Sequence, residues 1–158
     1  MVQLLAILHG MDFPNVYKAW HPGYEAFEAA SNAVYQSGLD PQLLNLVMTR
    51  VSQINGCAFC LDMHTADAVK AGVDQRKLNT LAAWRDVDWF TSEERAALAL
   101  AESVTRIGDG RSPDDNVTAA AVDVFGDETF AKLMFAIVVI NGWNRLNATT
   151  HVGPRPRP

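Results

Sequence analysis

The chain has 158 residues, a net charge of −5 and 49% apolar residues, which is an ordinary globular composition. Its 13 basic residues are scattered, and only the tail "RPRP" groups any of them, so the sequence does not predict a nucleic-acid surface. The N-terminal run "MVQLLAILHGMDF" has neither a basic n-region nor a small-residue cleavage site. We therefore expect this run to be part of the fold and the protein to be cytoplasmic.

The length favours one domain, which we place at residues 1–152, followed by a flexible Pro/Arg tail at 153–158. The longest apolar block, "LMFAIVVINGW" (133–143), is too short to span a bilayer and is typical of a buried helix. The sequence thus predicts no membrane association.

Helical punctuation runs along the whole chain. Asp40 with Pro41 forms a helix start, Gly72 a helix end, and Thr91 with Glu94 a capping box. The expected helices, each bounded by such signals, are 22–38, 41–54, 57–71 (capped by Asn55), 74–84, 92–107, 113–125 and 127–147. Sustained period-two alternation is absent from the sequence, so the predicted fold class is all-α.

Two apolar helical stretches end in the same tripeptide, Ile-Asn-Gly: "LVMTRVSQINGC" (46–57) and "LMFAIVVINGW" (133–143). Three shared residues are compatible with an ancestral helix-pair repeat and equally with coincidence. We expect Gly56 and Gly142 to let the helix backbone bend or pack closely.

The two cysteines of the chain, Cys57 and Cys60, are followed by His64 in the segment "NGCAFCLDMH". Positions i, i+3 and i+7 project from one helix face, so the thiols can close a disulfide and His64 can take a proton from Cys60. Cys57, near the helix start, is stabilised as a thiolate by the helix macrodipole. This pattern indicates a redox-active dithiol.

Other interpretations of the cysteine pair remain open at this point. Free cysteine is often buried, so the two could simply be core residues. A structural zinc site wants four ligands, and a fourth would have to come from His9, His21 or His151, to which we assign no other role. Attachment of c-type haem needs histidine where Leu61 stands, and a thioredoxin fold would place the pair after a strand. We predict neither a metal nor a cofactor.

Three segments closely resemble the AhpD-like alkylhydroperoxidase branch of the carboxymuconolactone decarboxylase family. They are "VSQINGCAFCLDMHTADAVKAG", "AAWRDVDWFTSEERAALALAESVT" and "VVINGWNRLN", within a resemblance that runs from Tyr24 to Asn147. It implies an AhpD-like helical bundle with the CxxC pair on a central helix, assembled into a homo-oligomer, a trimer or a hexamer. It also implies antioxidant reduction of an organic hydroperoxide, with a thiol or dithiol reductant, as a protein or a small molecule, reopening the disulfide.

The resemblance implies that Cys60 meets the peroxide, Cys57 resolves the sulfenic acid, and His64 relays the proton together with a glutamate. At the position of that glutamate, twelve residues before the first cysteine, this chain has Asn45. Asparagine can orient a histidine by a hydrogen bond but cannot accept a proton near neutral pH. Its presence should lower the pKa of His64 and raise the pKa of Cys60.

We therefore expect weak peroxidase turnover unless another carboxylate takes the place of the glutamate. The candidates for that replacement are Asp62, Asp67 and Glu102. The alternative function is a non-catalytic or weakly active helical oligomer, either a redox sensor or a vestigial site.

Aromatic and amide side chains are the remaining candidates. Trp84, Trp89, Phe90 and Trp143 either line a peroxide pocket or belong to the core or an interface. Asn141, Asn144, Arg145 and Asn147 form a polar face on an apolar helix, with Arg145 satisfying buried carbonyls or pairing across subunits. This face favours an oligomer interface over a substrate site.

Overall fold

The computed structural model describes residues 13–154, and every regular element in that range is a helix. In chain order these are α2 (Val16–Ala19), α3 (His21–Tyr35), α4 (Pro41–Asn55), α5 (Ala58–Lys70), α6 (Gln75–Thr80), the 3₁₀ helix η1 (Leu81–Asp86), α7 (Ser92–Thr105), the 3₁₀ helix η2 (Arg106–Asp109) and α8 (Asp115–Thr149). The predicted all-α class is confirmed. The expectations for the N-terminal run and for the "RPRP" tail fall mainly on residues 1–12 and 155–158, outside the described part of the chain.

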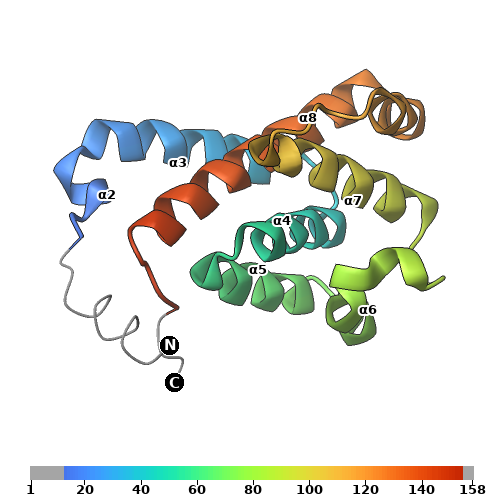
Figure 1. Ribbon diagram of the computed structural model, residues 1–158, viewed down its shortest axis with the longest axis horizontal. Coiled ribbons are helices and arrows are strands. Elements are labelled where there is room, and N and C mark those ends of the chain that lie inside the picture. Colours follow the sequence, from blue (N-terminus) through green and yellow to red (C-terminus); the bar gives the residue numbers. More distant parts are fainter. Residues whose placement is uncertain (1–12, 155–158) are drawn as a thin grey trace.

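Helix α4 is the most enclosed element of the fold. It packs against α5, α7 and α8, and Figure 1 shows it between α5 and the α7–α8 pair. Residues 44–52 are all buried, polar ones included, as expected of a helix with neighbours on several sides. The cysteine pair lies directly after this helix, at the junction of α4 and α5.

Local signals set the helix boundaries largely as predicted. Asp40 Oδ1 accepts the backbone N–H of Leu43 at 2.9 Å, and Pro41 occupies the first turn of α4. The Thr91–Glu94 capping box forms in both directions, with Glu94 N donating to Thr91 Oγ1 and Thr91 N donating to Glu94 Oε2. These two helix starts were readable because their hydrogen bonds are local.

Some elements differ from the prediction. Asn55 is the last residue of α4 and does not cap α5; Gly56, with φ of 67°, turns the chain so that Cys57 is the N-cap. The predicted break between the helices 113–125 and 127–147 is confirmed: Gly126, with a φ of 68° and a ψ of 167°, is not helical and divides the element α8 at this point. The short helix α2 was not predicted.

The buried apolar residues form two clusters. The larger one joins α4, α7 and α8 and includes both cysteines. The smaller one lies around α6 and η1 and includes Trp84 and Phe90, with Trp89 packed against it. These three aromatic residues are therefore core residues and do not line the pocket described below. Between residues 13 and 154, no helix has both the length and the apolar character needed to cross a membrane.

Candidate active site

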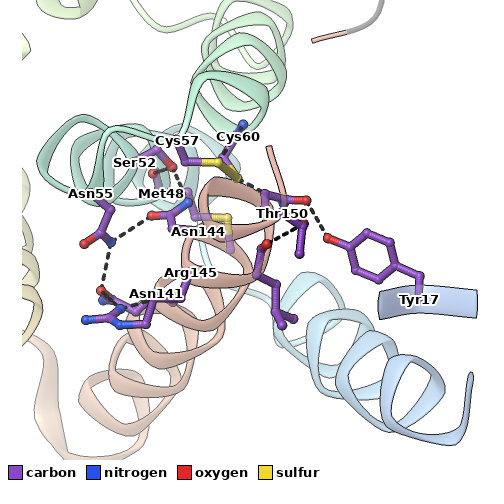
Figure 2. Close-up of a disulfide and its surroundings, with 12 residues drawn as sticks. Tyr17, Met48, Ser52, Asn55, Cys57, Cys60, Asn141, Asn144, Arg145 and Thr150 are labelled. Carbon is purple, nitrogen blue, oxygen red and sulfur yellow. Dashed lines mark hydrogen bonds between the residues drawn. A yellow bond between two sulfur atoms is a disulfide. The ribbon is translucent and has the colours of Figure 1, made fainter. Parts of the chain in front are cut away.

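Cys57 and Cys60 are joined by a disulfide in the first turn of α5 (Figure 2). Their Cα atoms are 5.4 Å apart, a separation that adjacent turns of one helix supply. The Cys57 N–H donates to Ser52 O at 3.1 Å, and the Cys57 Sγ accepts the N–H of Cys60 at 3.3 Å. Each cysteine is only 1% exposed. The spacing of the sequence thus produces a buried, closed dithiol site.

His64 lies one turn beyond Cys60 on α5 and is 2% exposed. Its Nδ1 has no hydrogen-bond partner among the described residues. Burial lowers the pKa of His64 from 6.5 to about 4, in the direction that the loss of a charge partner predicts. The imidazole is therefore neutral at pH 7: it is free to accept a proton, but the resulting cation is poorly stabilised.

Asn45 is buried on α4, and its side chain forms a hydrogen bond within the same helix. Its Nδ2 donates to Pro41 O at 2.9 Å, while its Oδ1 is buried without a partner within the described chain. The expected orienting hydrogen bond does not reach Nδ1 of His64, which is unpartnered. The Oγ1 of Thr49, one turn after Asn45, is also buried without a hydrogen-bond partner. Together with Asn45 Oδ1 and His64 Nδ1, it completes the set of such side-chain atoms in residues 13–154. All three unsatisfied atoms lie on α4 and α5, which pack together.

The carboxylates considered as replacements do not bond to Nδ1 of His64 either, since that atom has no described partner. Glu102 is held elsewhere: it accepts hydrogen bonds from Arg50 Nε at 2.7 Å, Arg85 Nη1 at 2.5 Å and Trp84 Nε1 at 3.1 Å. These donors hold the pKa of Glu102 below its usual value despite the opposing effect of burial. Its role in the fold is to pair two arginines.

A cavity of about 440 Å³ opens between α3, α5 and α8 and reaches Cys60 and His64. Its wall includes the aromatic side chains of Tyr17, Tyr24, Tyr35, Phe59 and Trp143 beside aliphatic and polar ones. Among the four aromatic residues considered from the sequence, Trp143 is the one that lines it. Cys57 is not part of the lining, so Cys60 is the cysteine that the cavity reaches.

The three asparagines of the polar face of α8 are buried within the chain and not on an exposed interface, whereas Arg145 is exposed. Asn55 Nδ2 donates to Asn141 Oδ1 and to Asn144 Oδ1, each at 2.9 Å, and Asn144 Nδ2 donates to Ser52 Oγ at 3.1 Å (Figure 2). Arg145 Nη1 donates to the carbonyl of Asn141 at 3.0 Å, which confirms the prediction that it satisfies a backbone carbonyl. The asparagines of the two Ile-Asn-Gly tripeptides thus bond to each other.

Two further residues contact the disulfide site and were not predicted to do so. Asn147 Nδ2 donates to Cys60 Sγ at 3.4 Å, and Tyr17 Oη donates to Asn147 Oδ1 at 2.5 Å. Figure 2 shows the Tyr17 side chain reaching from α2 toward α8. Tyr17 is far from the cysteines in sequence and has no motif around it, so the sequence carried no signal for this contact.

The described part of the chain offers no set of ligands for the metal site considered as an alternative. Residues 13–154 contain no group of three or more His, Cys, Asp or Glu side chains arranged to hold a metal ion. His9, one of the histidines considered as a fourth ligand, lies outside the described residues.

An all-helical fold with a CxxC disulfide at a helix start, a histidine one turn further and a cavity leading to both defines an AhpD-like protein. The chain belongs to the carboxymuconolactone decarboxylase family, whose model matches residues 22–103. The predicted family and fold are thereby confirmed.

Similar proteins support this assignment. The chain is 40% identical to the uncharacterized protein YdfG of Bacillus subtilis over 112 residues, which is 71% of this chain and 76% of YdfG. A crystal structure from Agrobacterium tumefaciens, ATU0492, is of a protein of unknown function that has been suggested to be the antioxidant defence protein AhpD. The ATU0492 structure matches this chain with a TM-score of 0.86 and 32% identity, and the match covers 93% of this chain and 100% of ATU0492. The debrominase Bmp8 shares the fold, with a TM-score of 0.73 at 19% identity, covering 82% of this chain and 69% of Bmp8.

Proposed function

We propose that the protein is a thiol-dependent peroxidase that reduces organic hydroperoxides through Cys60 and Cys57, with His64 as the base. The observation that carries the proposal is the cavity that leads to Cys60 and His64 together. Its volume lies in the range of small-molecule sites, and the aromatic and aliphatic side chains in its wall suit an organic group better than hydrogen peroxide alone. Family membership and the likeness to ATU0492 support a redox role.

The reaction begins from the reduced pair. His64 takes the proton of the Cys60 thiol, and the thiolate attacks the terminal peroxide oxygen, so that the O–O bond breaks. The sulfur is oxidised to a sulfenic acid, and the hydroperoxide, with the proton returned from His64, leaves as an alcohol. Cys57 then attacks the sulfenic sulfur, which releases water and forms the disulfide.

Regeneration needs a reductant, which we propose to be a thiol or dithiol, supplied as a small molecule or by a protein in the cytoplasm. Two thiols of the reductant give up their hydrogens and become a disulfide, while Cys57 and Cys60 return to thiols. The proposal also includes a homo-oligomer, a trimer or a hexamer. Phe135, 69% exposed, and Val138, 53% exposed, provide an apolar surface on α8 that suits contact with another copy.

A second candidate function is favoured by the state of the proton relay. Asn45 supplies no charge, and the pKa of His64 is about 4, so proton removal from Cys60 is poorly assisted. A protein of this kind would act as a slow redox sensor, or keep the disulfide as a vestige, without useful turnover.

Consumption of cumene hydroperoxide in the presence of a dithiol tests the proposal. We expect the wild type to consume it, Cys60→Ser to abolish consumption, and peroxide to convert two titratable thiols per chain to none. Hydrogen peroxide should be the poorer substrate. Loss of both thiols without catalytic consumption would favour the sensor. A Cys60→Ser variant that consumes the peroxide as fast as an active wild type would eliminate the peroxidase function.

A further inference from the structure

We propose that Asn147, held in place by Tyr17, is the side-chain donor that stabilises the Cys60 thiolate. The inference rests on the proposed function, because it assigns a role to groups around the thiol that this function uses. Asn147 contacts the reacting sulfur, and Tyr17 is a positioning residue that acts through Asn147.

The orientation of the Asn147 amide follows from its two partners. Asn147 is 4% exposed, and its Nδ2 lies 3.4 Å from Cys60 Sγ. A disulfide sulfur has no hydrogen to donate, so the amide must direct its N–H toward the sulfur. The Tyr17 hydroxyl, 2.5 Å from Oδ1, occupies the other end of the amide as a donor. A buried side chain with both ends engaged is pre-organised toward the sulfur.

Reduction of the disulfide makes this contact more favourable. An N–H donor to a thiolate forms a charge-assisted hydrogen bond, which is stronger than the same bond to a neutral sulfur. It therefore favours the anion over the thiol and lowers the thiol pKa. Cys60 also lies in the first turn of α5, where the positive end of the helix dipole acts in the same direction.

The other titratable groups around the sulfur do not supply this stabilisation. Those lining the cavity are Tyr17, Tyr24, Glu28, Tyr35 and His64. Within the described chain, none of them donates a hydrogen bond to Cys60, and His64 is neutral at pH 7 because its pKa is about 4. Because Asn45 stands in place of the family's glutamate, the thiolate must be stabilised by uncharged hydrogen-bond donors. Asn147 is the side chain that provides such a donor.

The chain has two cysteines, so Cys57→Ser leaves Cys60 as the sole thiol and makes a clean reporter. In that background, the rate of iodoacetamide alkylation as a function of pH gives the Cys60 pKa without any peroxide turnover. We expect Asn147→Ala to raise this pKa by about one unit, which lowers the rate about tenfold at a pH below the pKa. The near-isosteric Asn147→Asp, which replaces the donor by a negative charge, should raise it further.

Tyr17→Phe is the second variant, and it removes only a hydroxyl. It should raise the Cys60 pKa by a smaller amount than Asn147→Ala. Its matched control is Tyr24→Phe, because Tyr24 lines the same cavity but donates to Glu28 at 2.8 Å instead of to Asn147.

An unchanged Cys60 pKa in Asn147→Ala, or equal shifts in Tyr17→Phe and Tyr24→Phe, would overturn the inference. If Asn147→Ala fails to fold, the comparison of the two tyrosine variants decides. Because alkylation needs no peroxide, a protein without peroxidase activity can still confirm the role of Asn147, and failure of the two proposals is distinguishable.

Discussion

Asn55 and Asn141 bond to each other through their side chains, joining the last residue of α4 to the C-terminal half of α8. Asn141 also donates to Thr105 Oγ1 at 3.0 Å, so its amide ties α8 to α7 as well. The turn that carries Cys57 directly follows Asn55. The position of the disulfide relative to α8 therefore depends on amide hydrogen bonds between helices, in addition to apolar packing.

Asn141→Ala should lower the free energy of unfolding by about 1–3 kcal/mol, because its buried partners lose their hydrogen bonds. Urea unfolding of the oxidised protein measures this. Asn116→Ala, at an exposed position of α8, is the control and should change stability by less than about 0.5 kcal/mol. Equal effects of the two substitutions would show that the buried network contributes nothing beyond helix propensity.

Asn45→Glu should increase peroxidase turnover, by at least about tenfold, because a carboxylate at this position can stabilise the imidazolium and pass on its proton. It should also raise the pKa of His64 above its value of about 4, which NMR titration of the imidazole would detect. Asn45→Gln has the same length as glutamate without its charge and is the matched control. An equal gain in both variants would point to packing instead of proton transfer.

The stability of the protein should depend on His64 between pH 4 and pH 6.5. Unfolded, this histidine takes up a proton below its ordinary pKa of 6.5; folded, it does so only below about 4. The unfolded state therefore binds more protons in this window. Stability is fully present above pH 6.5 and falls as the pH drops, by up to about 3 kcal/mol.

Urea unfolding at several pH values, with the disulfide kept closed, measures this dependence. His64→Gln should flatten the curve between pH 4 and pH 6.5, whereas His151→Gln, at an exposed position, should leave it as in the wild type. A wild-type slope that survives His64→Gln would mean that other groups cause the acid sensitivity.

Gly142→Ala should destabilise the protein by about 1–3 kcal/mol, since an added methyl group would overlap the ring of Phe27 on α3. This agrees with the prediction that Gly142 permits close packing. Thermal unfolding is the measurement. Gly153→Ala is the control, because a Cβ there meets nothing within 4 Å. If Gly142→Ala is as stable as the control, Phe27 can move away without cost.

The sequence predicted the features that depend on local chemistry. Capping at Asp40 and Thr91 and the placement of Cys57, Cys60 and His64 on one helix segment follow from spacing along the chain. The N-cap of α5 was misplaced at Asn55 because asparagine before glycine suits both a helix cap and a helix end, and only the positive φ of Gly56 decides between them.

The surroundings of the disulfide were less predictable because they depend on tertiary contacts. Asn147 and its neighbours were assigned to an interface, since a polar face on an apolar helix is also what buried interhelical hydrogen bonds require. Glu102 was considered near the site, but its two arginine partners come from α4 and η1, which no sequence pattern brings together.

The cavity meets Cys60 but not Cys57, and this has a kinetic consequence for a peroxidase. The peroxide and the reductant would approach the same sulfur through the same space, at different stages of the cycle. One must leave before the other enters, so a ping-pong rate law with parallel reciprocal plots follows. At high concentration, each substrate would inhibit the enzyme by occupying the cavity in the redox state with which only the other substrate reacts.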